Sequence, residues 1–131
     1  MLDQSAVEAN VPAADLDRAR AYYSDKLGLT PVDELPGEQL RYQTKAGTFF
    51  NIYRTQYAGQ AGHTIAQWHV DDIEEEVRDL RAKGVVFEVY DDLPGVEWND
   101  QIASMPGLGK AAWFKDSEGN IMCIDQEEPR G

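Results

Sequence analysis

The chain contains two copies of one sequence pattern, and this internal repeat limits the possible folds more than any other feature. In each copy a strand-like run leads into an aspartate and a helix-like run, over residues 6–29 and again over residues 64–85. A second shared pattern, a glycine followed by an apolar strand, begins at Gly47 and recurs 72 positions later. Two similar modules are therefore expected, at residues 5–57 and 63–127.

The second copy is longer than the first. The glycine that closes the helix recurs 56 positions on, from Gly28 to Gly84, whereas Gly47 and Gly119 are 72 positions apart. The difference between the two offsets leaves 16 extra residues in the second copy. They fall within residues 91–110, where apolar and polar side chains show no sustained alternation, so an inserted loop is expected there.

Local patterns divide each copy into one helix and four strands. Apolar residues at every third or fourth position predict helices after Asp15 and Asp72, and an aspartate is a favourable N-cap. Gly28 and Gly84 are suitable residues to end these helices. Strands are expected at residues 6–11, 29–34, 40–45 and 48–53, and in the second copy from residue 64 and at residues 85–90, 111–115 and 121–126.

Charge and composition exclude several functions. The chain has 131 residues, and its 24 acidic and 12 basic side chains give a net charge of -12, which repels phosphate backbones and anionic lipids. No nucleic-acid or membrane partner is therefore expected, whereas a cationic ligand is compatible. With one cysteine, Cys123, no membrane-spanning run and no leader-like start, a cytoplasmic protein without disulfides is expected.

Two motifs carry a resemblance to a known family. Val70-Asp71-Asp72-Ile73 leads into the second helix, and an aspartate, an acid, a glycine and an asparagine form the turn before the last strand, within the run from Phe114 to Ile124. With the βαβββ repeat, they resemble the vicinal oxygen chelate superfamily of glyoxalases, bleomycin-resistance proteins and extradiol dioxygenases. The resemblance implies an α+β fold: a single domain at residues 5–127 whose two βαβββ modules form a curled mixed sheet with a ligand cup, usually completed by dimerisation.

The resemblance also implies four metal-binding positions, one on the first and one on the last strand of each module: Glu8, Asn51, Ile65 and Cys123. The repeat supports this assignment, because Glu8 and Ile65 are 57 positions apart and Asn51 and Cys123 are 72 apart. Members that bind divalent metals have histidine and glutamate here. Isoleucine has no ligand atom, an asparagine amide is a weak ligand and a lone thiolate suits these ions poorly, so no metal and no other cofactor is expected.

Alternation along the strands predicts which side chains face the cup. This set comprises Phe49, Asn51, Tyr53, His63, Ile65, Gln67, His69, Cys123 and Asp125. A few polar groups on an apolar wall are typical of a small-molecule pocket, although a closed core of hydrogen-bonded polar residues would show the same pattern. The predicted ligand-binding residues are Asn51, Tyr53, Gln67, His69 and Cys123, with residues 91–110 as a lid and Trp98 as its aromatic contact.

Catalytic roles stay open at this level. Glu8 and His69 are the candidates for a general base. His63 and His69 are about 20 Å apart along one strand, too far to chelate one ion together. Cys123 is either a nucleophile or an inert buried thiol, and no motif places a histidine beside it. Trp98 either stacks on a flat or cationic ligand or only holds its loop against the body.

We therefore expect a cytoplasmic homodimer, either side by side or swapped, that binds a small aromatic or cationic organic molecule without a catalytic metal. The alternative is an enzyme: a glyoxalase-like lyase or isomerase, or a dioxygenase-like enzyme. Such an enzyme would be metal-free, with Glu8 or His69 as base, or would hold a metal through rearranged ligands. A pure interaction module is the third hypothesis, and it predicts a cup filled by its own side chains.

Overall fold

A computed structural model describes residues 1–128, which form two compact units. Unit 1 contains residues 1–60 and residues 117–120, and unit 2 contains residues 61–116 and the described residues from Ile121 onward. Each unit combines one α-helix with β-strands, which confirms the α+β class. The turn at residues 117–120 belongs to unit 1, although the strands on either side of it belong to unit 2. The sequence repeat does not indicate that this turn belongs to the other unit.

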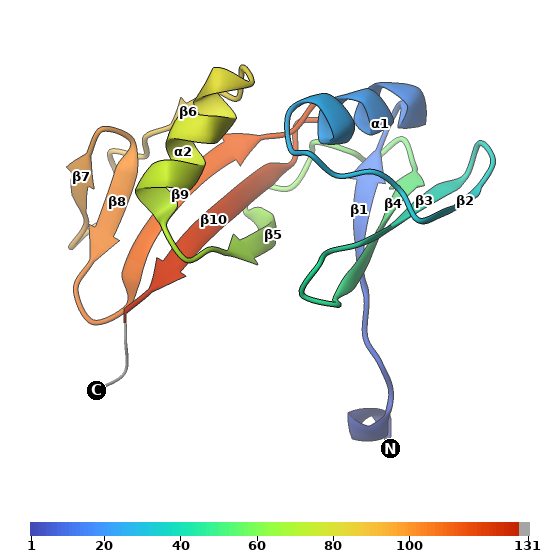
Figure 1. Ribbon diagram of the computed structural model, residues 1–131, viewed down its shortest axis with the longest axis horizontal. Coiled ribbons are helices and arrows are strands. Elements are labelled where there is room, and N and C mark those ends of the chain that lie inside the picture. Colours follow the sequence, from blue (N-terminus) through green and yellow to red (C-terminus); the bar gives the residue numbers. More distant parts are fainter. Residues whose placement is uncertain (129–131) are drawn as a thin grey trace. The chain divides into compact units, whose positions relative to one another are not determined.

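Unit 1 is a four-stranded sheet with helix α1 on one face (Figure 1). A short 3₁₀ helix (Leu2–Gln4) precedes the strands β1 (Ala9–Ala13), β2 (Asp33–Leu35), β3 (Gln39–Gln43) and β4 (Phe49–Arg54). The strand order is β1-β4-β3-β2, with β1 parallel to β4 and the other pairs antiparallel. β1 continues through Pro12, beyond the expected strand, which is possible because proline is tolerated in an edge strand.

Both helices begin where the sequence predicts. The side chains of Asp15 and Asp72 accept hydrogen bonds from backbone amides three residues later, at 3.0 and 3.2 Å, and such a cap contributes about 1 kcal/mol. Helix α1 spans Leu16–Asp25 and helix α2 spans Ile73–Ala82. The predicted apolar faces are buried: Leu16, Ala19 and Tyr23 in α1, and Ile73 and Val77 in α2. Neither described helix has the length and apolar character needed to cross a membrane.

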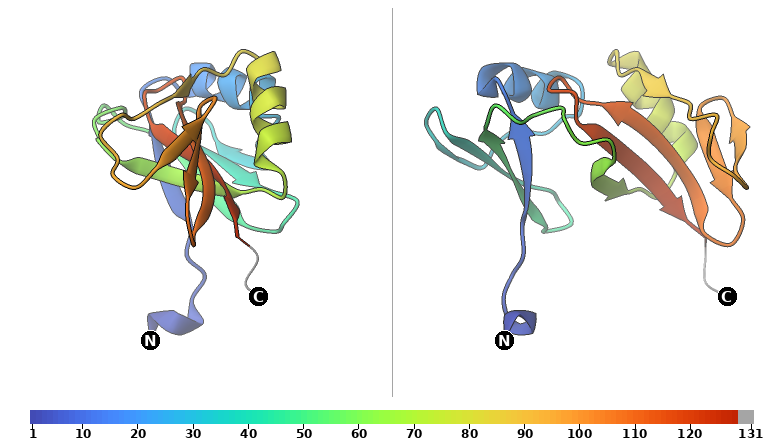
Figure 2. Two further views of the ribbon diagram at one scale, coloured as in Figure 1. Left: turned by 90° about the vertical axis from the view of Figure 1, so that its left-hand side faces the viewer. Right: turned by 180° about the vertical axis from the view of Figure 1, so that it is seen from behind.

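Unit 2 repeats this arrangement with more strands. They are β5 (Thr64–His69), β6 (Phe87–Glu88), β7 (Glu97–Asn99), β8 (Ile102–Met105), β9 (Gly109–Lys115) and β10 (Ile121–Glu127), in the order β5-β10-β9-β8-β7 with β6 also paired to β9. β5 is parallel to β10, as β1 is to β4. Helix α2 lies across one face of β9 and β10, and the view from behind in Figure 2 shows that no described helix of unit 2 covers the other face.

The extra residues of the second copy form a hairpin, which corrects the loop expected at residues 91–110. β7 and β8 pair with each other, and β8 extends the sheet along the edge of β9. These strands of three and four residues are too short to show a clear alternation. Their turn is formed by Asp100 and Gln101, both with positive φ, so it lacks the glycine or proline that usually indicates a hairpin.

The turn before β10 contains the most specific motif of the sequence, and the buried Glu118 in this motif has a clear structural role. Glu118 accepts hydrogen bonds from the amides of Ala14 and Asp15, each at 3.0 Å, and from Arg18 Nε at 2.8 Å. Burial by itself raises the pKa of Glu118, but these hydrogen bonds and the guanidinium charge outweigh it and lower the pKa to about 2. The carboxylate thus satisfies backbone amides at the start of α1.

Candidate functional site

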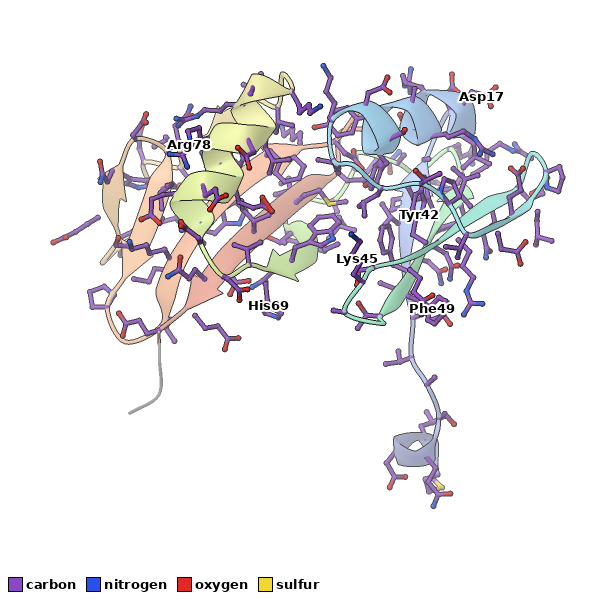
Figure 3. The ribbon with its side chains drawn as sticks, in the orientation of Figure 1. Asp17, Tyr42, Lys45, Phe49, His69 and Arg78 are labelled. Carbon is purple, nitrogen blue, oxygen red and sulfur yellow. The ribbon has the colours of Figure 1, made fainter. Side chains whose placement is uncertain are left out.

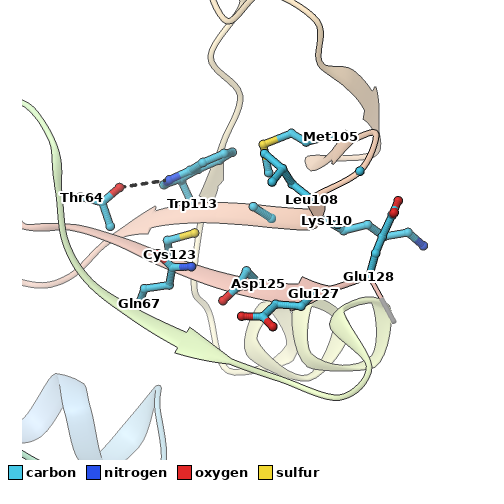
Figure 4. Close-up of a pocket in the computed structure, with 13 residues that line it drawn as sticks. Thr64, Gln67, Met105, Leu108, Lys110, Trp113, Cys123, Asp125, Glu127 and Glu128 are labelled. Carbon is cyan, nitrogen blue, oxygen red and sulfur yellow. Dashed lines mark hydrogen bonds between the residues drawn. The ribbon is translucent and has the colours of Figure 1, made fainter. Parts of the chain in front are cut away.

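Unit 2 contains an open cavity of about 510 Å³ on the sheet face opposite α2 (Figure 4). Alternation along β10 places Cys123 and Asp125 in the cavity wall, while Met122 and Ile124 are buried on the other face. Gln67, the residue of β5 that is in register with Cys123, also lines the cavity. Two of the predicted ligand-binding residues, Gln67 and Cys123, therefore lie together in the wall of one cavity.

The apolar side of this cavity is centred on Trp113 of β9. The Trp113 ring contacts the rings of Tyr90 and Trp98, at centroid distances of 5.8 and 6.0 Å. Its indole Nε1 donates to Thr64 Oγ1 at 3.3 Å, as the dashed line in Figure 4 shows. Trp98 contacts Trp113 but is not among the cavity-lining residues, so a direct contact between Trp98 and a ligand stays a prediction.

An irregularity in β5 changes which of its residues reaches the cavity. Ile121 is in register with Thr64, whereas the next residue of β10, Met122, is in register with Ala66. Ile65 is thus the extra residue of a bulge, and Thr64 lines the cavity in place of Ile65. Regular alternation predicts Ile65 on this face, and no glycine or other local signal in the sequence indicates the bulge.

One end of the cavity is acidic. Asp125, Glu127 and Glu128, which we call the acidic end, line it together, and the cation beside them, Lys110, is bound to Glu74 with a distance of 2.6 Å between Nζ and Oε1. The hydrogen bond from Lys110 lowers the pKa of Glu74. Because that ammonium is already paired, the acidic end keeps a negative potential that favours a positively charged group.

Cys123 is a buried thiol rather than a thiolate. Burial, with a further contribution from the negative charge of Asp125, raises the pKa of Cys123 to about 12. Its sulfur donates to the carbonyl oxygen of Ile124 at 3.5 Å. Since the thiolate is the nucleophile and the metal ligand, Cys123 is in the wrong protonation state for either role near neutral pH.

In unit 1 the predicted residues Glu8 and Asn51 belong to a connected polar cluster. Glu8 accepts from Arg41 at 2.7 Å and from Asn51 Nδ2 at 3.2 Å. The Asn51 amide oxygen in turn accepts from Gln39 at 3.2 Å, and the Arg41 guanidinium lies 4.1 Å from the centroid of Phe49, at the start of β4 in Figure 3. Tyr53, the third residue predicted to bind ligand from this unit, is on β4 and 39% exposed.

The four family metal positions do not offer a suitable donor set. In unit 1 both oxygens of Glu8 are occupied by protein donors, one of them the cationic Arg41. In unit 2 Ile65 has no ligand atom and Cys123 is held as a thiol. A divalent cation at these positions would have to displace an arginine and would gain few oxygen or imidazole ligands in return.

His69 lies at the end of β5 (Figure 3), close to two carboxylates of the acidic end. Its Nδ1 is 2.8 Å from Asp125 Oδ1 and 3.7 Å from Glu127 Oε1. His63 is exposed, and its Nδ1 lies 3.0 Å from the carbonyl oxygen of Thr64. Of the two candidate bases, Glu8 is therefore held by Arg41, and His69 faces carboxylates.

Trp113 lines the cavity although it is not among the predicted cup residues, and the sequence does contain a signal for it. The turn at residues 117–120 joins two antiparallel strands, and counting outward from that turn places Trp113 directly opposite Cys123, as the structure has it. Cys123 was already assigned to the cup, so strand pairing assigns Trp113 to the same face. Met105 and Leu108 also line the cavity, but they come from the hairpin segment that the sequence does not indicate.

Several solved structures share this fold. A lactoylglutathione lyase from Agrobacterium tumefaciens has a TM-score of 0.69 at 20% identity, with 93% of each chain covered. A bleomycin-binding protein in complex with bleomycin has a TM-score of 0.69 at 19% identity, with 95% of this chain and 99% of that chain covered. A fosfomycin resistance protein from Listeria monocytogenes, in complex with Mn(II) and a dihydroxypropylphosphonic acid, has a TM-score of 0.65 at 15% identity, with 92% and 89% covered.

The TM-scores show that these proteins share a fold with this chain. Sequence identities of 20% or less do not show a shared activity. The comparison with curated proteins gave no match. The comparison with protein families is more direct, because the match covers residues 5–124. The chain belongs to the Glyoxalase/Bleomycin resistance protein/Dioxygenase superfamily.

Proposed function

We propose that this protein binds a small organic molecule, flat and positively charged, in the cavity of unit 2. The observation that carries the proposal is one open space of about 510 Å³ with an aromatic wall at Trp113 and carboxylates at its other end. Pockets of this size commonly bind small molecules through an apolar wall and a few polar groups. Thr64 and Gln67 provide the polar groups beside the ring.

The charges in this cavity favour a cation over an anion. The acidic end has three carboxylates, and the neighbouring Lys110 is engaged by Glu74. A net charge of -12 for the whole chain adds a long-range attraction for cations. A flat cation would make two favourable interactions, because its ring stacks on Trp113 and its charge faces the carboxylates.

The superfamily contains both binding proteins and enzymes, and the chemistry of the candidate bases supports binding. One structural neighbour is a bleomycin-binding protein and another is a lactoylglutathione lyase. A general base needs a free lone pair directed at substrate, yet Glu8 is engaged by Arg41 and His69 faces Asp125. The open cavity also supports binding over the pure interaction module, which requires a space filled by the protein's own side chains.

The proposal includes the remaining features expected from the sequence. The ligand is bound with no metal at the family positions, whose donor set argues against one. The protein acts as a cytoplasmic homodimer. The outer strands β2 in unit 1 and β7 in unit 2 each have one edge with no partner strand among the described residues, which leaves backbone groups available for contacts between copies.

Binding of two matched dyes tests this function. The cation N-methylacridinium and the anion acridine-9-carboxylate share one ring system and differ in charge. We expect the cation to bind with one site per chain and the anion to bind at least about tenfold more weakly, measured by fluorescence titration at low ionic strength. Trp113→Leu is expected to weaken binding of the cation by about tenfold or more, because the stacking surface is lost.

Trp68→Phe is the matched control, because Trp68 stacks on Phe114, which is buried on the other face of the sheet. This variant is expected to bind the cation like the parent protein. The proposal fails if neither dye binds, if the anion binds equally well, or if Trp113→Leu has no larger effect than Trp68→Phe. Chemical conversion of a bound dye, detected by mass spectrometry, would favour the enzyme instead.

A further inference from the structure

We propose that His69, Asp125 and Glu127 form a binding site for a divalent transition-metal ion, separate from the four family metal positions. Each of the three side chains offers one ligand atom, and these atoms all lie within 4.8 Å of one another. This inference does not depend on the proposed organic ligand, because the metal alone is the probe that tests it.

The backbone fixes two of these side chains directly opposite each other. His69 of β5 is in parallel register with Asp125 of β10. The amide of Val70 donates to the carbonyl oxygen of Asp125 at 2.8 Å, which anchors the end of β5 against β10. Glu127 follows Asp125 by two residues on β10, so its side chain emerges on the same face. The site therefore rests on paired strands rather than on a loop.

The distances between the ligand atoms suit one ion. His69 Nδ1 is 2.8 Å from Asp125 Oδ1 and 3.7 Å from Glu127 Oε1. Ligand atoms at about 2.1 Å from a tetrahedral metal are roughly 3.4 Å apart. Glu127 is 62% and His69 is 68% exposed at the side chain, so both can adjust while Asp125 stays fixed.

The surroundings of Asp125 also favour a cation. Its Oδ1 is fully shielded from solvent, only 13% of its side chain is exposed, and the oxygen lies 2.8 Å from His69 Nδ1. That contact satisfies the buried carboxylate oxygen only if the ring proton is on Nδ1, and it is unfavourable if two acceptors face each other. A cation between Asp125 and the imidazole would satisfy this oxygen and bind the ring nitrogen that faces it.

The donor set indicates the class of ion. One imidazole and two carboxylates are typical ligands of zinc, manganese, iron and nickel, whereas magnesium and calcium prefer oxygen alone. Three protein ligands leave further coordination positions open, and two of the ligands, Asp125 and Glu127, line the cavity (Figure 4). The ion would therefore bind two of the three carboxylates of the acidic end, and the organic cation of the proposed function would compete with it for them.

Zinc titration of the whole protein tests the inference. After treatment with EDTA and its removal, we expect calorimetry to show one Zn²⁺ per chain. His69→Ala and Asp125→Asn are each expected to weaken binding by about tenfold or more, because they remove the ring nitrogen and the carboxylate that face each other at 2.8 Å. Glu127→Gln is expected to weaken binding by less, because its carboxylate lies farther from that nitrogen, at 3.7 Å. Cobalt provides the spectroscopic test, since imidazole and carboxylate ligands give visible bands without the thiolate charge-transfer band that Cys123 would add.

The chain offers two matched controls. His63 is its only other histidine and lies beside the same strand, so His63→Ala should leave zinc binding unchanged. Glu8→Gln alters a family position and should also leave it unchanged. In proton NMR spectra zinc should shift the one imidazole signal that disappears in His69→Ala.

The inference is overturned if no zinc binds, if His69→Ala and Asp125→Asn bind zinc as the parent does, or if Glu8→Gln abolishes binding. Far-ultraviolet circular dichroism establishes that each variant is folded, so loss of binding cannot arise from unfolding. Failure of this site is distinguishable from failure of the proposed function, because Trp113→Leu affects only the organic cation and His69→Ala affects only zinc.

Discussion

At the scale of single residues, the Glu118 carboxylate is the most constrained charge in unit 1. Its side chain has no contact with solvent, and it accepts from two backbone amides, from Arg18 and from Ser117 Oγ. A buried carboxylate is stable only when donors replace its hydration, and here all of them come from the start of α1 or from the same turn. The motif therefore stabilises the junction of a turn and a helix.

We predict that Glu118→Gln lowers the free energy of unfolding by roughly 2–4 kcal/mol near neutral pH, because a neutral amide loses the charge and one of the two acceptor oxygens. The pKa of Glu118 is lowered from 4.5 to about 2 in the folded protein. Its contribution is thus complete above the unfolded pKa and is lost as the pH falls toward about 2. Urea denaturation across this range should show the parent and variant converging.

The exposed pair of Glu38 and Arg54, at 3.1 Å, provides the control. Glu38→Gln should cost less than about 1 kcal/mol at any pH, because solvent screens an exposed pair. Equal effects of the two glutamine substitutions would show that Glu118 is not the anchor described, as would a gap that stays constant down to low pH.

At the scale of elements, the start of β9 depends on a close approach between two backbones. Gly109 has φ of +127°, and a Cβ atom there would lie 2.2 Å from the carbonyl oxygen of Gln126 and 3.0 Å from the Cα of Glu127. Gly109 is also paired in register with Met105 of β8 and with Glu127 of β10. This glycine therefore allows the hairpin, β9 and the acidic end to meet.

We predict that Gly109→Ala destabilises the protein by roughly 3 kcal/mol or more, because either β10 moves or the backbone strains. Gly107 is the control, because an alanine there tests the effect of a positive φ without a steric clash. It has φ of +85° with nothing near its missing Cβ, so Gly107→Ala should cost only about 1 kcal/mol. Thermal denaturation by calorimetry measures both variants, and equal losses would rule out the steric explanation.

These elements also show how far the sequence could predict the structure. The helices were predictable because aspartate caps and apolar faces are local signals, and both begin at the expected residues. β7 and β8 were not predictable from the sequence. A strand of three residues is too short to show an alternation of apolar and polar side chains, and the turn between these strands uses Asp100 and Gln101 in place of glycine. Pairing between strands that are not joined by a turn, such as β6 with β9, also has no signal in the local sequence. β6 and β8 both pair with the same edge of β9.

The same distinction applies to the candidate site. Cys123 and Gln67 were assigned from strand alternation and lie in the cavity wall, whereas the bulge at Ile65 brought Thr64 there instead. The hydrogen-bond partners of Glu8 were also unpredictable, because Arg41 comes from a strand that the repeat alone does not place beside it. Alternation specifies a face, and only the register of the neighbouring strand specifies which groups meet on it.

At the scale of the whole molecule, the dominant feature is an excess of acidic over basic residues, 24 against 12. Some basic residues are already used in ion pairs, such as Arg41 with Glu8 and Lys110 with Glu74, and the acidic residues outnumber the basic ones by 12. Such a charge attracts cations to any open carboxylate cluster. It also opposes contact between two copies of the chain, each carrying a charge of -12.

We predict that the protein is a homodimer whose dissociation constant falls as salt is added. Two chains of like charge repel each other over a Debye length, which shrinks from about 30 Å at 0.01 M salt to about 8 Å at 0.15 M. Sedimentation velocity should therefore show twice the mass of one chain at moderate ionic strength and partial dissociation at low ionic strength. Sucrose at matched osmolality should not restore the dimer, because it does not screen charge. The mass of one chain under every condition would refute the dimer, and a dimer that tightens at low salt would mean that complementary charges, rather than repulsion, dominate the contact between copies.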